Sequence, residues 1–223
     1  ELYLRLKNNP NYEVYKTTIE TLDICNEEAV RNEIVKIKPY FVINCAAYTN
    51  VDGCETHFEL ANSVNGMAVL NIAKAVAQRS TCLRTKVGCV IVNHDEIIAT
   101  GYNGAPRGRK NCIDLGYCTK KKIFPDIRHG GYDACRSVHA EQNAIISARR
   151  QDMIGATLYL TLYKPSTGNY EPGANSCQMC RKMIINSGIQ KVVIRGEIDE
   201  EYLEVDVEDW IQNDEILEGK LTY

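Results

Sequence analysis

The sequence lacks three features that would place it quickly in a class of protein. No apolar run approaches the roughly 18–20 residues needed to cross a bilayer, and no signal peptide opens the chain, so we expect a cytoplasmic protein without a membrane partner. There is no basic excess, because 26 Lys and Arg stand against 29 Asp and Glu, and this argues against a nucleic-acid partner. Internal repeats and low-complexity stretches are also missing. The 223 residues therefore suit one large globular domain or two small ones.

Cysteine, by contrast, is abundant, with ten residues in the chain. Because no export signal is present, we expect these thiols to stay reduced, and reduced cysteines near histidines suggest a metal site. The plainer interpretation of several of them is a small buried apolar side chain. We expect that role for four cysteines in helix-like or strand-like contexts: Cys25, Cys45, Cys54 and Cys89.

Residues 1–66 alternate between helical and strand patterns, which is typical of parallel βαβ units. We expect helices over residues 2–7 and 26–37, a short strand at 13–15 and a buried strand at 41–47.

The same segment resembles part of the dTDP-4-dehydrorhamnose reductase family, a nicotinamide-dependent Rossmann group. The glycine-rich turn of that family would lie before Glu1, and its Tyr-x-x-x-Lys pair has no counterpart downstream. We therefore interpret residues 1–66 as an incomplete Rossmann-like βαβ fragment that cannot act as a reductase alone. The matching stretches are Leu22–Ile24, Lys38–Pro39, Val42–Thr49, Val51–Asp52 and Val64–Asn65.

From about Met67 the pattern changes, and we expect a second domain over residues 67–223. A long loop at 103–135, rich in glycine and charge, separates its two halves. The predicted helices are 68–78 (amphipathic), 139–150, 177–186 and 208–213, and the predicted strands are 87–92 and 97–102 (a hairpin), 156–162 and 191–195.

The strongest chemical signal is His139-Ala140-Glu141, followed downstream by Cys177-Gln178-Met179-Cys180. Hydrolytic removal of an aromatic amine needs a water that is nucleophilic near neutral pH, and zinc lowers the pKa of water to roughly 7. A catalytic zinc has three protein ligands and one open position, and His139, Cys177 and Cys180 supply one nitrogen and two thiolates. Each ligand group begins a predicted helix, where the N-terminus favours thiolates.

Glu141 is the expected catalytic residue, which takes a proton from water, protonates the ring nitrogen N3 and later helps ammonia to leave. Residues two apart do not share a face of a regular helix, so His139 and Glu141 can converge only at the first turn. Taken alone, His-x-Glu is common on helix surfaces, and Cys-x-x-Cys also occurs in structural zinc and redox sites. Together and in this order, they match the zinc deaminase signature His-x-Glu, then Pro-Cys-x-x-Cys.

Residues 68–216 resemble bacterial dCMP deaminases, members of the zinc-dependent cytidine/deoxycytidylate deaminase family. The resemblance implies a three-layer α/β core of the cytidine-deaminase type, with a central mixed sheet and helices on both faces. It also implies a zinc enzyme that hydrolyses dCMP to dUMP and ammonia, which feeds thymidylate synthesis. One departure is Asn175-Ser176 before Cys177, where a proline is usual; it loosens the turn but keeps every ligand. The matching stretches are Gln78–Arg84, Val87–Val92, Ala99–Pro106 and Cys135–Ile145.

The same resemblance implies two substrate contacts. Asn103 is expected to hydrogen-bond the sugar 3′-hydroxyl, and the backbone of Ala140 is expected to contact the pyrimidine carbonyl. The plainer role of Asn103 is that of a turn residue that tolerates left-handed geometry.

Regulated family members bind dCTP or dTTP, with Mg2+ on the triphosphate, through an element that resembles Gly101–Gly104. Such regulation implies a homo-oligomer, commonly a hexamer. The candidate phosphate or effector contacts are Arg84, Lys86, Tyr102, Gly104 and Arg107, although solvation at the surface is the plainer role of each charged one.

A second cluster of soft ligands lies in the long loop. Some dCMP deaminases hold a structural zinc with residues from these regions, and a second Zn2+ would order the loop. The alternative is a set of loop thiols without metal. The residues are Cys82, Cys112, Cys118, His129 and Cys135.

Three alternative functions remain at this stage. The substrate of the same chemistry could be a nucleoside or adenosine in tRNA, but the acidic chain has no basic stripe. A nicotinamide-binding module with an inert deaminase tail is disfavoured because the glycine-rich turn is missing. A purely structural zinc protein would not need Glu141 beside an open coordination position.

Overall fold

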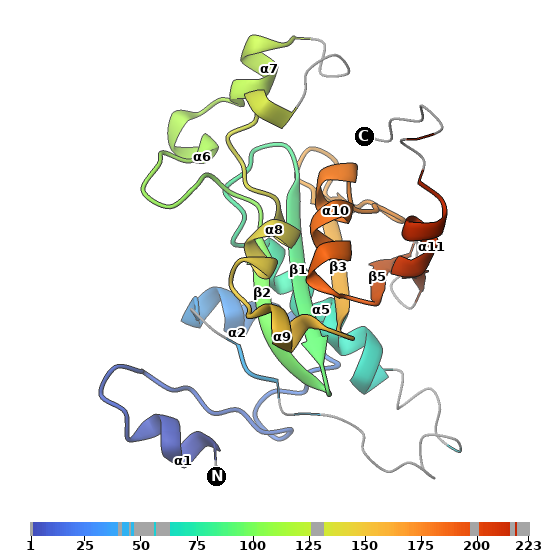
Figure 1. The fold of residues 1–223 in the computed structure, drawn as a ribbon. Helices are drawn as coiled ribbons and strands as arrows, with labels where there is room; N and C mark the ends of the chain where they lie inside the picture. The colour runs from blue at the N-terminus through green and yellow to red at the C-terminus, as the bar shows by residue number, and fades with distance from the viewer. Residues whose placement is uncertain are drawn as a thin grey trace.

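The computed structural model describes residues 2–39, 42–44, 46, 56, 63–125, 132–196, 201–214 and 217. A mixed sheet stands between two layers of helices, with α8, α9 and α10 in front of it and α2 and α5 behind it (Figure 1). The three-layer α/β core predicted for the deaminase-like part is therefore confirmed. Helix α1 (Leu2–Lys7) lies apart from the sheet.

The sheet has the strand order β2-β1-β3-β5-β6, and the short β4 pairs with β3 at its edge. All pairings are antiparallel except that of β3 with β5, whose connection is the helix α10, so a single βαβ crossover makes the sheet mixed. The bounds are β1 Lys86–Asn93, β2 Glu96–Tyr102, β3 Thr157–Lys164, β4 Asn169–Tyr170, β5 Lys191–Arg195 and β6 Tyr202–Asp206.

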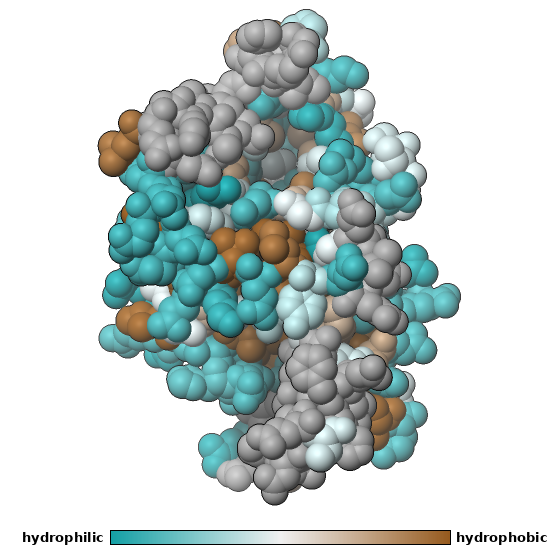
Figure 2. Space-filling model, turned by 90° about the vertical axis from the view of Figure 1, so that its right-hand side faces the viewer, coloured by the Kyte–Doolittle hydropathy of each residue, from teal (hydrophilic) through white to brown (hydrophobic). Residues whose placement is uncertain are grey.

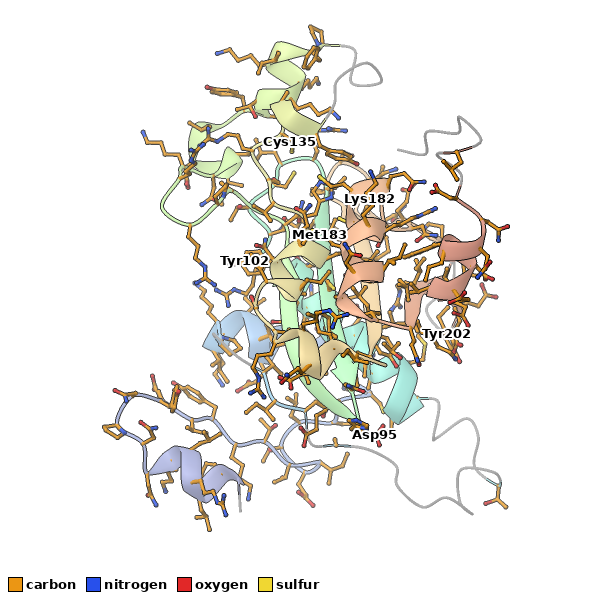
Figure 3. All side chains as sticks on the ribbon, in the orientation of Figure 1. Asp95, Tyr102, Cys135, Lys182, Met183 and Tyr202 are labelled. Carbon is orange, nitrogen blue, oxygen red and sulfur yellow. The ribbon has the colours of Figure 1, made fainter. Side chains whose placement is uncertain are left out.

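The hairpin between β1 and β2 forms as the sequence predicts. Its turn residues His94 and Asp95 have φ values of 48° and 62°, the left-handed geometry whose twist matches that of paired strands. Figure 3 shows Asp95 at one end of the sheet, and Cys135 lies toward the other. The hairpin turn is thus remote from the end of the sheet that carries the loop of residues 103–135.

The front layer consists of α8 (Ala140–Ile145), α9 (Arg150–Met153), α10 (Gln178–Ser187) and α11 (Val207–Gln212). It packs on the sheet through one apolar cluster that includes Ile91, Leu158, Ile184 and Ile194. Helix α10 begins at the cap residue Cys177 and ends at Gly188, which has a φ of 87° and so provides the left-handed C-cap that glycine favours.

The rear layer pairs helix α5 (Ala68–Ala77) with helix α2 (Glu27–Ile37), which comes from the reductase-like segment. All ten residues of α5 are buried, so the helix predicted to be amphipathic has no exposed face. The reason is that Val30 and Ile34 of α2 join the apolar cluster of α5. Lys74 of α5 also forms an ion pair with Glu27. The N-terminal segment therefore covers the core rather than lying beside it.

Two glycines allow helices to approach the sheet closely from opposite sides. A Cβ at Gly88 on β1 would lie 2.0 Å from the carbonyl oxygen of Ala73 in α5. A Cβ at Gly101 on β2 would lie 2.1 Å from the carbonyl oxygen of Ala140 in α8. Any larger side chain would push the helix away, so these positions set the distance of both layers from the sheet.

Short helices occupy the segment predicted to be one long loop. They are α6 (Cys112–Leu115), α7 (Thr119–Ile123) and the 3-10 turn η3 (Tyr132–Ala134), and Figure 1 shows α6 and α7 beyond the end of the sheet. A π-helical turn, η1 (Ser63–Met67), leads into α5.

Several local predictions differ from the structure. The strand predicted at residues 13–15 is not formed, because no described strand offers it backbone partners. Of the strand predicted at 41–47, the described residues 42–44 and 46 are outside any strand, and the others lie outside the described residues. The helix predicted over 139–150 is interrupted between α8 and α9, where the Ser147 hydroxyl donates to the Asn143 carbonyl.

The surface that Figure 2 shows is mostly hydrophilic, with an apolar area near its middle. Among the residues that the structure describes, no helix is long and apolar enough to cross a membrane.

Candidate active site

His139 and Cys177 are the cap residues of two neighbouring helices. The extended backbone of His139, with ψ at 158°, precedes the first residue of α8, and its N–H donates to Gln142 Oε1 at 3.0 Å. Cys177 has the same geometry, with ψ at 163°, before α10. Because α8 and α10 pack together, their N-termini bring side chains separated by 38 residues to one point.

Three soft donors meet there. His139 Nδ1 lies 3.5 Å from Cys177 Sγ and 3.3 Å from Cys180 Sγ, and all three donor atoms lie within 4.8 Å of one another. Zinc–sulfur and zinc–nitrogen bonds of about 2.3 and 2.0 Å at a tetrahedral angle put sulfur and nitrogen roughly 3.5 Å apart. Within the described ranges, no other group of three such residues is close enough to hold a metal. The donor types and their spacing thus fit a zinc ion.

Of the two thiols, Cys177 ionises readily and Cys180 keeps its proton, so the pair carries one negative charge that favours a cation. The hydrogen bond from Cys180 lowers the pKa of Cys177 to about 4, against the effect of burial and with the help of His139. The same hydrogen bond and burial raise the pKa of Cys180. Burial lowers the pKa of His139, but its hydrogen bond to Cys177 and the charge of Glu141 outweigh this effect and leave it raised. A metal ion that displaces the remaining thiol proton would therefore neutralise a negative site.

Glu141 lies in the first turn of α8 and is only 5% exposed. Burial raises the pKa of its carboxyl group, which its own backbone N–H and the positive charge of His139 oppose. The two side chains converge because His139 is a cap residue with an extended backbone, so the spacing rule for regular helices does not apply to it. A buried carboxylate with a raised pKa beside a metal site is suited to carry protons.

Ser176 takes the position before Cys177. It is buried, and its hydroxyl oxygen has no partner at hydrogen-bond distance among the described residues. This hydroxyl still lies near enough to the Glu141 carboxylate to lower its pKa. Its carbonyl accepts from Arg181 Nε at 3.0 Å, so the turn into α10 is braced without the usual proline.

Comparison with known proteins identifies the family. The family model described as the cytidine and deoxycytidylate deaminase zinc-binding region matches residues 65–195. The chain belongs to this deaminase family. The RmlD substrate binding domain matches residues 1–84, so the reductase resemblance of the N-terminal region is confirmed. The two matches overlap over α5.

Relatives of the deaminase family cover much of the chain. The deoxycytidylate deaminase of Mycobacterium phage D29 is 41% identical over 132 residues, which are 57% of this chain and 91% of the phage protein. That of Saccharomyces cerevisiae is 36% identical over 140 residues, which are 61% of this chain and 39% of the yeast protein. Among solved structures, the apo dCMP deaminase from cyanophage S-TIM5 is 29% identical, with a TM-score of 0.40, and the match covers 60% of this chain and 83% of that one.

Asn103 follows β2 and is buried in the deaminase core. Its Oδ1 accepts from Ser80 Oγ at 2.6 Å and from the backbone N–H of Val87 at 2.9 Å, and its Nδ2 donates to the Thr85 carbonyl at 3.0 Å. These bonds hold the end of the hairpin in place. One amide hydrogen of Nδ2 has no partner in the described part of the chain and is free to meet a ligand.

Ala140 is fully buried at the start of α8. First-turn N–H groups of a helix have no acceptor within the helix, so its backbone amide can donate to a ligand. The α8 start is also tied to the end of β2: Asn143 Nδ2 donates to the Tyr102 carbonyl at 2.7 Å, and Gly104 forms a bridge with Val138. These contacts connect the segment that carries Asn103 to the segment that carries His139 and Ala140.

The five candidate phosphate or effector contacts differ in exposure, and their role stays a prediction. Arg84 and Arg107 are exposed, Lys86 is half-buried and Gly104 is buried. The Tyr102 side chain packs with the α5 cluster, on the face of the sheet opposite α8, where Arg79 lies 5.2 Å from its ring centroid.

The second cysteine cluster is loose in this structure. Burial raises the pKa of Cys112, and the charges of three other thiols add to this effect, so the four cysteines lie in one neighbourhood. No three of them come close enough to hold a metal in the described ranges. His129 lies outside the described residues. A structural zinc at Cys82, Cys112, Cys118, His129 and Cys135 stays a prediction.

Two residues beside the site were not predicted from the sequence. The Tyr132 ring meets His139 edge to face, with ring centroids 4.4 Å apart at 78°. The ammonium of Lys120 lies 4.8 Å from the centroid of the Tyr132 ring. Burial raises the pKa of Tyr132 to about 12, with further contributions from Cys177 and Cys180. Nothing in the sequence marks either residue, because Lys120 is one of three consecutive lysines and Tyr132 is one of 13 tyrosines.

Proposed function

We propose that this chain is a hydrolytic deaminase that converts dCMP to dUMP and ammonia, with a zinc ion held by His139, Cys177 and Cys180. The observation that carries the proposal is the buried Glu141 next to three metal donors at two helix N-termini. A structural zinc site has four protein ligands, whereas a catalytic one has three and an open position. The 41% identity to the phage deoxycytidylate deaminase supports the choice of substrate.

The bound zinc would supply the Lewis acidity that makes water nucleophilic near neutral pH. Glu141 would take one proton from that water and deliver it to N3 of the cytosine ring. The oxygen forms a bond to C4, the bond from C4 to the exocyclic amine breaks, and Glu141 passes the second proton to the departing ammonia. The raised pKa of Glu141 helps it to hold a proton between these steps.

Substrate orientation rests on the groups that the fold leaves unused. The Ala140 backbone N–H is suited to the pyrimidine carbonyl, and the remaining amide hydrogen of Asn103 to the 3′-hydroxyl of the sugar. Residues 67–223 contain all of these groups, so we propose that they form the catalytic domain and that residues 1–66 are a reductase-derived fragment without catalytic groups of its own.

Regulation is the finer part of the proposal. The resemblance of residues 101–104 to the effector-binding element of regulated relatives supports binding of dCTP or dTTP with Mg2+, and supports a homo-oligomer such as a hexamer. Light scattering of the purified protein and its rate of dCMP turnover, each measured with and without dCTP and Mg2+, test both points. An unchanged monomer with unchanged kinetics would refute them.

The function is tested by following the ultraviolet change on deamination of dCMP, CMP and deoxycytidine by the zinc-loaded protein. We expect rapid loss of dCMP and much slower loss of CMP and deoxycytidine. Glu141→Gln should keep one zinc per chain and lose turnover by about 100-fold or more, since a positioned general acid–base contributes 10²–10⁴-fold. Normal turnover of this variant would refute the role of Glu141, and inert wild-type protein with bound zinc would refute the reaction.

A further inference from the structure

Lys120 is a buried cation at the edge of the candidate site. It lies on α7, where Lys121 and Lys122 follow it directly, and those two are exposed whereas Lys120 is only 8% exposed. Long charged side chains rarely leave the solvent without a partner, because burial of an uncompensated ammonium is costly. The burial of Lys120 therefore needs an explanation, whereas the exposed Lys121 and Lys122 need none.

The partner found for this ammonium within the described ranges is an aromatic ring, not a carboxylate. Its Nζ lies 4.8 Å from the centroid of the Tyr132 ring, and no ion pair includes it in that part of the chain. The face of an aromatic ring attracts a cation but carries no net charge, so it does not neutralise the ammonium of Lys120. An anion that entered the site would be attracted to this ammonium.

The Tyr132 ring contacts both the Lys120 ammonium and the ring of the metal donor His139. Tyr132 stands between Lys120 and His139, with 4.4 Å between the tyrosine and imidazole centroids. Figure 3 shows Cys135, which follows Tyr132 closely in the chain, between α7 and the adjacent end of α10. Lys120 and His139 thus contact the same side chain, that of Tyr132.

The other charges at the site favour a cation near the position of the substrate phosphate. Two thiolates and the carboxylate of Glu141 outweigh the two positive charges of a zinc ion, so the centre itself repels a phosphate dianion. A nucleoside monophosphate that puts its base against the donors carries its phosphate one sugar away. Arg84 and Arg107 are exposed, so solvent and salt screen their charge, whereas the buried Lys120 acts at a lower dielectric.

We propose that Lys120 binds the 5′-phosphate of the substrate and makes the site prefer a nucleotide to a nucleoside. This inference rests on the proposed deaminase function, and it assigns the choice of substrate to a residue that the sequence does not distinguish.

Lys120→Met and the control Lys121→Met, one position further along α7, test the proposal. We expect Lys120→Met to lose about 10- to 100-fold in kcat/KM for dCMP, as expected for one hydrogen bond to a charged group, and to keep its kcat/KM for deoxycytidine. Lys121→Met should match the wild type on both substrates. Zinc content should be equal in all three proteins. Calorimetric titration with dUMP and deoxyuridine provides a readout without turnover, in which only dUMP binding should weaken in Lys120→Met.

A dCMP-to-deoxycytidine ratio within twofold of the wild type in Lys120→Met would overturn the inference. An equal loss on both substrates would also overturn it, because Lys120 would then only support the structure. If Lys120→Met does not fold, Lys120→Gln takes its place in the same comparison. Should the wild type fail to deaminate dCMP, the proposed function fails, and the dUMP titration still decides whether Lys120 recognises phosphate.

Discussion

Substitution of Val30 and Ile34 by alanine tests whether the reductase-like segment is part of the folded deaminase core. Both residues lie on the inner face of α2 and are 2% and 9% exposed. They pack with α5, which is buried along its entire length and contacts β1 and β3 on its other side. Loss of these two side chains would open the rear layer of the core.

The expected magnitude follows from burial. Truncation of a buried isoleucine to alanine costs about 2–5 kcal/mol, and Ile34 lies at the rim, so we expect about 2–3 kcal/mol. Truncation of Val30 removes less volume and should cost about 1.5–2.5 kcal/mol. The residues share contacts, so the double substitution should cost about 3–5 kcal/mol. This is a large part of the roughly 5–15 kcal/mol that stabilises a domain.

Urea unfolding measures this cost directly. With a slope of about 2 kcal/mol per molar urea, a loss of 4 kcal/mol lowers the midpoint by about 2 M. Val35→Ala is the matched control, because Val35 lies on the same helix and is 50% exposed, so its substitution should change stability by less than about 0.5 kcal/mol. A double variant as stable as Val35→Ala would show that α2 is detached in solution. Residues 67–223 would then be sufficient for a stable domain.

Three further predictions concern the site. Gly101→Ala should lower zinc content and activity together, measured by metal analysis and dCMP turnover, because the new Cβ would lie 2.1 Å from a backbone oxygen of α8; wild-type zinc content would contradict this. In protein stripped of metal by a chelator, iodoacetamide at pH 6 should label Cys177 before Cys180, because a pKa of about 4 keeps Cys177 a thiolate there, and zinc should protect it; equal labelling in peptide mass spectra would refute the pKa assignment. Ser176→Ala removes a hydroxyl that lowers the pKa of Glu141, so that pKa should rise and the acid limb of the kcat/KM profile should move to higher pH; an unmoved limb would show that the hydroxyl is too far away to act.

The grouping of the three candidate metal donors and the elements that carry them could be predicted because the signals are local. A cap residue, an apolar period and a terminal glycine place α10 between Cys177 and Gly188 within one residue of its observed bounds. The hairpin around His94 and Asp95 is equally local. The predicted core layers follow from such elements, since each has one apolar face to bury.

Other features depend on contacts between distant segments and have no local signal. Lys120, Lys121 and Lys122 are indistinguishable in the sequence, and only the first of them is buried, on a helix that contacts η3. Strand β6 (Tyr202–Asp206) alternates weakly and forms because β5 offers it an edge. The cover that α2 gives to α5 joins a helix matched only by the RmlD model to a helix that both family models match, and it depends on contacts between residues about 40 positions apart, for which the sequence has no local signal.

The separation of the metal donors along the chain has a consequence for synthesis. His139 leaves the ribosome 38 residues before Cys177, a delay of roughly 2–8 s at 5–20 residues per second. During that interval β3 is being made, and α10 does not yet exist to present its two sulfur atoms. Helices α2 and α5, by contrast, are complete before the first strand of the sheet is translated. If the site binds zinc as we propose, the ion can meet its three donors only after α10 has been made, when both helices of the rear layer have already been translated.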